Sequence, residues 1–519
     1  MSNPILCSFD SIDRDNIVDI LCRSSITDRE YIGLKPHIDY LVKYCNDIGV
    51  KTIIVENEYI DRDFLEDYAG FYVRCFSEYH SKCCRLHLFN FNISKKQFNR
   101  LLLGRNSVQL IEKMKAPGNY LGFMVIKPLP RTVLGRTCLR VRPELEQGHF
   151  IGRSYNVNLY GIPLVAEKTI AFQEQDHVVA ACATSALWSA FQCTGQVFRH
   201  HIPSPVEITK SALQRFPMSE REFPNSGLYD IQIANAIRGV GLDPIPYNFD
   251  PSARDEISKL RTVIYAYLKA GIPILLGVRL LGLPNEPGHA VAVTGFKLNP
   301  AYAPASGGST HLMANGLKMI YAHDDGIGPY APMELTIIDY QGKKAAAFTT
   351  DWRDQHGNPV YALPDYLFVP VYHKIRIPFA SVLESVVSFD DWIKRLYGQG
   401  IHLFQNGLEW DVYLTTVSNL KTEIEGNSRL SGAYRKTILT QPMPRFIWRA
   451  TARCQGSAVL DLLYDATDID QGAFFVRVIE YDCGKQYSYV LRALSKVEAF
   501  TNWNKADPLW MVLRWFAHS

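Results

Sequence analysis

The sequence predicts a multidomain α+β protein, and three observations support this class. The chain has 519 residues, enough for about three domains at roughly 150 residues each. Its apolar content of 47% and charged content of 21% are ordinary for a folded protein. In the middle of the chain, segments with a helical period come first and apolar, β-rich segments follow. This order is typical of helices packed on an antiparallel sheet.

Three domains are therefore expected. An N-terminal mixed α/β domain covers 1–165, an α+β domain covers 166–375, and a C-terminal domain that also mixes helices and strands covers 376–519.

Charge and composition exclude several classes of protein. The net charge is +3 and basic residues are scattered, so no nucleic-acid footprint is expected. No run of about 18 apolar residues occurs, so no membrane span is expected. The first residues lack a basic region followed by an apolar core, so no signal peptide is expected. Eleven cysteines, an odd number spread over a long chain, favour reduced thiols and a cytoplasmic setting.

The N-terminal third alternates helical and β-rich segments. Helices are expected over 35–49 and 93–104, each ended by a glycine, and strands over 51–60, 86–93, 120–130 and 136–143.

One cluster in this third has the residue types of a zinc site. His80, Cys83, Cys84 and His87 would share a face if they lay on a helix. A strand that begins near Arg85 would separate them, and free cysteines are commonly buried apolar groups. We therefore predict no metal here, and the sequence indicates no cofactor elsewhere.

The central third contains three segments that carry chemistry. Cys182 begins an apolar helix, where the helix N-terminus favours the thiolate form. His289 opens a strand within PGHAVAVTGF, and Asp324 and Asp325 close the strand MIYAHDD. A thiol, an imidazole and a carboxylate are the parts of a nucleophilic triad.

The elements around these segments follow from periodicity and glycine stops. A loop followed by a helix is expected over 202–216, a helix that ends at Gly239 or Gly241 and then an extended segment over 226–247, and a helix over 253–271. Strands are expected over 272–280, 287–298, 319–325 and 365–377. The segment 301–316 is rich in Gly, Ala, Ser and Pro. It is expected to be a mobile hairpin loop that either gates the cleft or only connects two strands.

The central third resembles the papain-like cysteine peptidase superfamily. It is most similar to the bacterial branch that processes double-glycine leader peptides. The matching pieces are Gln175, Cys182, GIPILLGV, GHAVAVTGF and IYAHDD. The resemblance covers about two fifths of the chain and neither flank.

The resemblance implies a role for each matching residue. Cys182 is the expected nucleophile and His289 the general base. An acid at the end of strand 319–325 orients the imidazole, and Gln175 with the Cys182 backbone N–H forms the oxyanion hole. Gln173 is an alternative to Gln175. Because successive strand residues point to opposite faces, only one of Asp324 and Asp325 is expected to reach His289, and Asp324 is favoured.

A cysteine peptidase that hydrolyses a peptide or isopeptide bond is thus the leading hypothesis. The same triad serves acyl transfer, transglutamination and deamidation. A non-catalytic papain-like module for binding is a hypothesis of another class. The expected partners are a protein or peptide substrate and, through the flanks, a further protein. A bacterial defence or toxin effector is one possible setting.

The C-terminal third again alternates helices and strands. The segment 377–398 is expected to begin as a strand and continue as a helix that ends at Gly398, and 409–424 to be a strand that turns into a helix. Strands are expected over 457–469 and 472–482, and a docked helix over 507–516.

Overall fold

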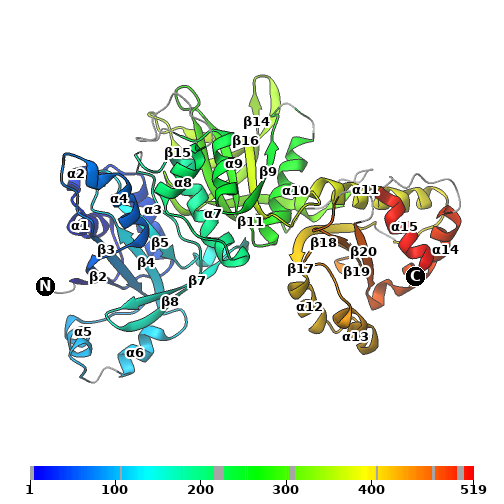
Figure 1. The fold of residues 1–519 in the computed structure, drawn as a ribbon, viewed down its shortest axis with the longest axis horizontal. Coiled ribbons are helices and arrows are strands. Elements are labelled where there is room, and N and C mark those ends of the chain that lie inside the picture. The colour runs from blue at the N-terminus through cyan, green and yellow to red at the C-terminus, as the bar shows by residue number, and fades with distance from the viewer. Residues whose placement is uncertain are drawn as a thin grey trace. The chain divides into compact units, whose positions relative to one another are not determined.

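Helices and sheets are combined in both parts of the molecule, which confirms the α+β class (Figure 1). The computed structural model describes residues 5–105, 108–176, 178–214, 227–251, 253, 255–300, 302, 310–404, 407–469, 474–499 and 508–519. The chain divides into two compact units. Unit 1 comprises 1–253, 271–297 and 319–371, and unit 2 comprises 254–270, 298–318 and 372–519.

Unit 1 begins with a five-stranded antiparallel sheet in the order β1-β2-β3-β4-β5. The strands are β1 (Ile5–Ser8), β2 (Thr52–Tyr59), β3 (Cys83–Phe89), β4 (Tyr120–Ile126) and β5 (Leu134–Leu139). The associated helices are α1 (Arg14–Ser24), α2 (Arg29–Gly33), α3 (His37–Asp47), α4 (Arg62–Gly70), α5 (Lys95–Leu102) and α6 (Val108–Lys115). A separate hairpin, β7 (Arg153–Leu159) with β8 (Ile162–Thr169), follows.

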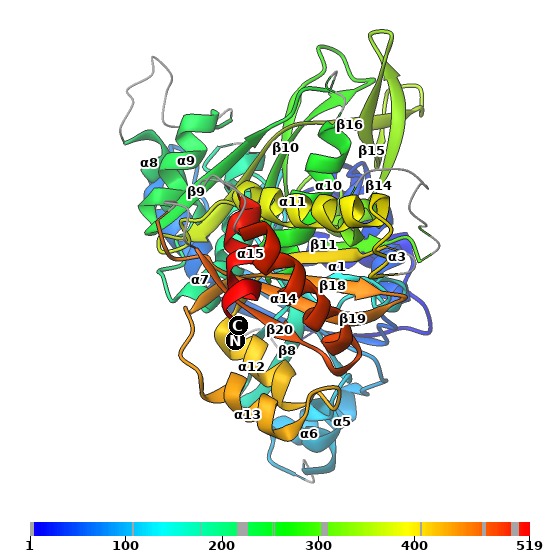
Figure 2. The same cartoon turned by 90° about the vertical axis from the view of Figure 1, so that its right-hand side faces the viewer.

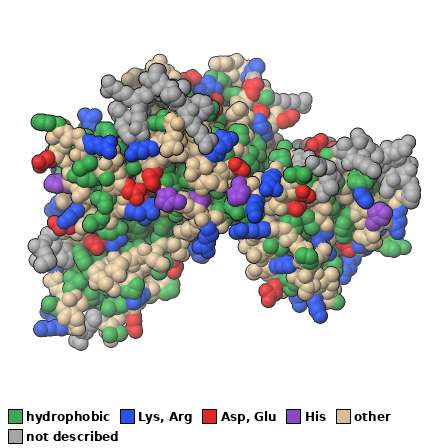
Figure 3. Space-filling view, viewed as in Figure 1, with side chains coloured by type: hydrophobic (Ala, Val, Ile, Leu, Met, Phe, Trp, Pro, Cys, Tyr) green, Lys and Arg blue, Asp and Glu red, His purple; other side chains and the backbone are tan. Residues whose placement is uncertain are grey.

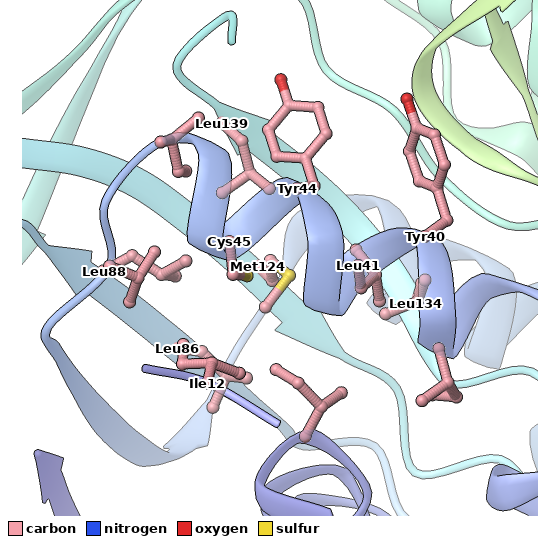
Figure 4. Close-up of a cluster of buried hydrophobic side chains, with 14 of the residues drawn as sticks. Ile12, Tyr40, Leu41, Tyr44, Cys45, Leu86, Leu88, Met124, Leu134 and Leu139 are labelled. Atoms are coloured by element: carbon pink, nitrogen blue, oxygen red, sulfur yellow. The ribbon is translucent and has the colours of Figure 1, made fainter. Parts of the chain in front are cut away.

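Helix α3 is attached to this sheet by the apolar face that its period creates. Leu41 and Cys45 lie among buried side chains from β3, β4 and β5 (Figure 4). Tyr40 and Tyr44 project from the same helix with their hydroxyls pointing away from these strands (Figure 4). The core therefore fixes the direction in which both hydroxyls reach.

A second, eight-stranded sheet follows in unit 1. Its strands run in the order β10-β11-β13-β14-β15-β16-β9, β6 pairs with β11, and a further pairing of β10 with β16 closes six strands into a ring. The strands are β6 (His149–Phe150), β9 (Leu242–Asn248), β10 (Ile274–Leu281), β11 (Gly288–Leu298), β13 (Leu317–Asp324), β14 (Gly328–Tyr340), β15 (Lys343–Arg353) and β16 (Pro359–Tyr372). Helices α7 (Cys182–Phe198), α8 (Pro205–Leu213) and α9 (Asp230–Gly239) accompany it.

The division into two units differs from the three domains expected from the sequence. The core of the first sheet includes Phe172, Tyr321, Ile327 and Tyr330 from the central third. Because these side chains are buried together with residues of α1 and α3, the first 165 residues and most of the central third form one compact body.

Unit 2 is a three-layer arrangement around a five-stranded sheet in the order β12-β17-β18-β19-β20. Figure 2 shows α11, α14 and α15 on one side of this sheet and α12 and α13 on the other. The strands are β12 (His311–Leu312), β17 (Glu409–Thr416), β18 (Phe446–Cys454), β19 (Ser457–Asp465) and β20 (Phe475–Glu480). The helices are α10 (Glu256–Lys269), α11 (Phe379–Gly398), α12 (Val417–Glu425), α13 (Gly432–Thr440), α14 (Lys485–Ala499) and α15 (Pro508–His518).

Short 3-10 turns complete the described elements. They are η1 (Tyr72–Arg74), η2 (Pro143–Leu145), η3 (Met313–Gly316) and η4 (Asp482–Gly484). Of the segment 301–316, residues 301 and 303–309 lie outside the described residues, so its expected role as a loop is untested there. Its last residues form β12 and η3 in unit 2.

Among the described residues, no helix is both long and apolar enough to cross a membrane. Basic and acidic side chains are interspersed on the visible face (Figure 3).

Candidate functional site

Cys182 is the first residue of α7 and is only partly buried. Ala181 before it has extended backbone angles and offers no side-chain cap, so the first N–H groups of α7 have no cap from that residue. The helix dipole places partial positive charge there, which favours a negative group. Cys193 on the same helix is fully buried and donates to the Gly271 carbonyl at 3.5 Å. The two thiols of α7 therefore have different environments, because Cys193 is enclosed in the core whereas Cys182 is partly exposed at the helix start.

His289 is the second residue of β11 and lies opposite Val278 of β10. Its Nε2–H donates to Asp324 Oδ1 at 3.1 Å, and the Cys182 thiol is one of the neighbours that raise the pKa of the ring. Since Nε2 is occupied by Asp324, Nδ1 is the nitrogen available to the thiol. One imidazole thus has both the carboxylate and the thiol as neighbours.

Electrostatics in this buried site favour a charged imidazole. Burial by itself lowers the pKa of His289, but the charge and hydrogen bond of Asp324, the Cys182 thiol and the charge of Asp325 raise it well above the usual value. Burial alone would raise the pKa of Asp324. The positive charge of His289 and hydrogen bonds from His289, Trp352 and the Gly326 N–H hold it below its ordinary value.

The two acids at the end of β13 have different roles in the structure. Asp324 receives the hydrogen bond of His289, whereas Asp325 Oδ1 lies 3.7 Å from His289 Nε2. Neither carboxylate oxygen of Asp325 accepts a hydrogen bond from another described residue. Burial raises the pKa of Asp325, and the charge of Asp324 adds to the rise against the opposing charge of His289.

Trp352 is a site residue that sequence reasoning missed. Its indole N–H donates to Asp324 Oδ2 at 2.9 Å, and its ring lies edge-on to His289 with centroids 5.5 Å apart. It belongs to β15, and no element was expected over 326–364. The sequence contains a signal for the hairpin of β14 and β15, because Gln341 and Gly342 separate two β-rich runs. In the structure both residues have positive φ (53° and 77°), as a tight hairpin turn requires.

The approach loop, residues 173–181, is held by the first sheet and its helices. Asp176 accepts N–H groups of Val178, Val179 and Ala180 at 2.8 to 3.0 Å, and Tyr72 donates to its other oxygen at 2.8 Å. Glu174 accepts the Val133 and Leu134 N–H groups at 3.1 Å and pairs with Lys35. Residues before 140 therefore set the path of the chain into Cys182.

Both candidate oxyanion glutamines lie in this approach loop, in different environments. Gln173 is 3% exposed, and its amide Nε2 has no hydrogen-bond partner among the described residues. Gln175 is partly buried, and its backbone carbonyl accepts from Thr132 at 3.3 Å. A buried amide donor without a partner is costly, so the Gln173 amide differs from that of Gln175 in having a free, buried donor.

The turn after Asp325 is held by α3. His37 Nε2 bonds the Asp325 carbonyl at 2.6 Å, and the Tyr40 hydroxyl donates to the Pro329 carbonyl at 2.7 Å. Gly328 has φ +150°, and a Cβ there would lie 2.5 Å from the Tyr40 ring. Glycine is required at this position because the ring occupies that space.

His323 belongs to the core rather than to the site. Its Nε2–H donates to the Ile170 carbonyl at 3.2 Å, and its Nδ1 accepts the Tyr330 N–H at 3.2 Å. Burial lowers its pKa to about 3, so it stays neutral and structural.

Tyr366 of β16 lies near Cys182. Burial raises its pKa, and the negative charge of Cys182 adds to the rise. Its ring covers Gly277 of β10 so closely that a Cβ there would lie 2.2 Å from a ring carbon. The missing side chain at Gly277 thus allows an aromatic ring to lie beside the thiol.

Potential metal ligands gather in one place. Among the described residues, His289, Asp324 and Asp325 form a group whose ligand atoms all lie within 4.8 Å of one another. The cluster at 80–87 forms no such group there. Because β3 begins at Cys83, Cys83 and Cys84 point to opposite faces, and His87 is buried beside Glu56 and Tyr120.

No protein-family model matches the chain, and no curated protein matches it.

Proposed function

We propose that this protein is a cysteine peptidase with a papain-like central part, acting on a peptide or isopeptide bond of a protein or peptide substrate. One observation carries the proposal. A single buried imidazole, that of His289, bonds the buried Asp324 carboxylate and has the partly buried Cys182 thiol as a neighbour that raises its pKa. The helix before an antiparallel sheet, with the cysteine at the helix start, supports the same assignment.

The mechanism follows from this order of groups. His289 takes the proton of Cys182, and Asp324 stabilises the imidazolium that results. The thiolate attacks the carbonyl carbon, and the proton on His289 passes to the leaving amine as the C–N bond breaks. Water, deprotonated by His289, then hydrolyses the thioester and restores the thiol.

The negative oxygen of the tetrahedral intermediate needs donors. The Cys182 backbone N–H at the start of α7 supplies one. A glutamine amide supplies the second, and the unpartnered Nε2 of Gln173 favours that residue over Gln175.

Transfer of the acyl group to an amine instead of water uses the same residues, so transglutaminase or deamidase chemistry is the second candidate. A binding module without chemistry is less favoured, because a thiol, an imidazole and a carboxylate all remain at the site and Trp352 and Gly326 hold the carboxylate on the imidazole.

The first experiment is alkylation of the folded protein at about pH 6, read by mass spectrometry of each cysteine. A thiol with an unperturbed pKa of about 8.5 is only about 0.3% ionised there. We expect Cys182 to react more than about tenfold faster than the other cysteines, and His289→Ala to remove the difference.

His323→Ala is the matched control, since this buried histidine is next to Asp324 in the chain but its ring nitrogens bond only the Ile170 carbonyl and the Tyr330 N–H. If Cys182 reacts no faster than Cys483, which is exposed, the proposed thiol chemistry is wrong.

A further inference from the structure

We propose that His289, Asp324 and Asp325 bind one divalent transition cation, for which Zn²⁺ is the best fit, and that this cation reversibly blocks Cys182. The binding of the cation is argued from the three side chains alone. The inhibition of Cys182 rests on the proposed function.

The spacing of the three groups suits a tetrahedral metal. Zinc bonds of about 2.0 to 2.2 Å place neighbouring ligand atoms about 3.3 Å apart. His289 Nε2 lies 3.1 Å from Asp324 Oδ1 and 3.7 Å from Asp325 Oδ1. All three ligand atoms lie within 4.8 Å of one another, so side-chain movement has to close the widest gap to about 3.3 Å when a cation binds.

Asp325 is the observation that points to a ligand. Its side chain is 2% exposed and lies beside the imidazole. Neither of its carboxylate oxygens accepts a hydrogen bond from another described residue. A buried carboxylate without donors is costly, so such groups are usually paired or metal-bound. Asp324 needs no such partner, because Trp352 and the Gly326 N–H already bond it.

The kind of donor selects the metal. One imidazole nitrogen with two carboxylates suits Zn²⁺, whereas Mg²⁺ and Ca²⁺ prefer oxygen ligands throughout. Three protein ligands leave a fourth position for water. Cys182 is not a ligand in this arrangement, because the group of ligand atoms that lie within 4.8 Å of one another comprises His289, Asp324 and Asp325 and not its sulfur.

Zinc binding at His289 deprives the Cys182 thiol of its general base. The Nε2 proton, now donated to Asp324, passes to solvent when Nε2 takes the metal. The imidazole then carries a cation on Nε2, so it is a weaker base at Nδ1 and no longer accepts the Cys182 proton. Asp324 is also withdrawn from the imidazole. The site is therefore active without zinc and blocked with it.

The test uses the full chain and zinc chloride, titrated against a chromophoric zinc chelator. We expect one site that survives in Cys182→Ala and weakens more than about tenfold in Asp325→Asn. Asp351→Asn is the matched control, because Asp351 is an exposed acid next to Trp352 and should leave the affinity unchanged. Urea unfolding of each variant establishes that it is folded, and His289→Gln, which removes the nitrogen ligand, serves as a second variant.

Cobalt(II) tests the ligand type. The site should give a cobalt absorption spectrum without a thiolate-to-metal charge-transfer band. Loss of the site in Cys182→Ala, or unchanged affinity in Asp325→Asn, overturns the proposal.

The alkylation rate of Cys182 measures the inhibition by zinc. Zinc should lower this rate to that of the other cysteines, and a chelator should restore it. If zinc binds at Asp325 but Cys182 is slow even without zinc, the proposed function fails and the metal site stands. If Cys182 is fast and zinc leaves it fast, the metal block fails and the proposed function stands.

Discussion

Trp352 orients the Asp324 carboxylate through one hydrogen bond. Its indole N–H donates to Asp324 Oδ2, while His289 and the Gly326 N–H donate to Oδ1. The carboxylate is thus satisfied on both oxygens and cannot rotate without losing a bond. Its orientation toward His289 depends on a residue 28 positions further along the chain.

Trp352→Phe should therefore slow the alkylation of Cys182 and lower stability. The change leaves a buried carboxylate oxygen without its donor, at a cost of about 1 to 3 kcal/mol. Urea unfolding measures the stability, and mass spectrometry the alkylation.

Trp448→Phe is the control for this change, because Trp448 is a buried tryptophan of unit 2 whose indole N–H also donates to an oxygen, the Ile377 carbonyl, at 2.9 Å. It should lower stability without changing Cys182. Equal effects of the two variants on Cys182 would contradict the positioning role of Trp352.

Asp67 should make stability depend on pH. Burial raises its pKa well above the usual value, and Asp176 adds to the rise, although Lys127 and the Val206 N–H oppose it. A raised pKa in the folded state means that the neutral acid is favoured. Its contribution to stability is complete below about pH 4 and is lost as the pH rises toward the folded pKa.

Asp67→Asn keeps the acceptor for Val206, 2.9 Å away, and removes the titration. Between about pH 5 and about pH 7 the wild type should lose up to about 1.4 kcal/mol per pH unit relative to this variant, measured by urea unfolding. Parallel stability curves for the two proteins would show that Asp67 is charged in the fold.

At the scale of elements, the approach loop and α7 act together. The backbone N–H groups of three consecutive residues, Val178, Val179 and Ala180, donate to the same oxygen of Asp176. These bonds fix the backbone of the loop just before Cys182. In the sequence, Asp176 looks like an ordinary polar loop residue.

Asp176→Ala should cost about 3 kcal/mol, because it leaves three buried N–H groups and the Tyr72 hydroxyl without their acceptor. Tyr72→Phe removes only one of the four bonds and should cost about 1 kcal/mol. Urea unfolding measures both costs, and alkylation of Cys182 should slow in the same order. A larger effect in Tyr72→Phe would contradict this account of the loop.

At the scale of the molecule, the first 165 residues are part of the body that carries the site. Asp63 of α4 accepts the indole N–H of Trp188 on α7 at 2.8 Å. His37 and Tyr40 of α3 hold the turn that follows Asp325. The N-terminal part therefore stabilises both α7, which begins at Cys182, and the turn after β13, which ends at Asp324.

A fragment of residues 166–375 should consequently fail to fold on its own. It would expose Phe172, Tyr321 and Tyr330, which are buried against the first sheet. We expect no cooperative thermal transition for this fragment, and recovery of Cys182 reactivity when 1–165 and 166–519 are produced together as two chains. A stable, reactive fragment would show that the N-terminal part is dispensable.

The sequence by itself predicted the α+β class, most of the helices and strands, and the three segments that carry Cys182, His289 and Asp324. Helical periodicity, glycines at helix ends and β-rich runs are local patterns, so they can be recognised from the sequence without a structure. Whether these residues perform the expected chemistry remains a prediction until Cys182 is tested.

Only the tertiary structure decided which residues meet. It placed Asp324 rather than Asp325 on the hydrogen bond of His289, as expected. The expectation that only one acid reaches His289 is wrong, because Asp325 Oδ1 also lies 3.7 Å from its Nε2. Strand alternation does not separate the two side chains, since β13 ends at Asp324 and its pairing with β14 is irregular there. The tertiary structure also brought in Trp352 and attached the N-terminal third to the site. These contacts join residues far apart in the chain, and no local pattern specifies them, because they arise from how whole sheets and helices pack.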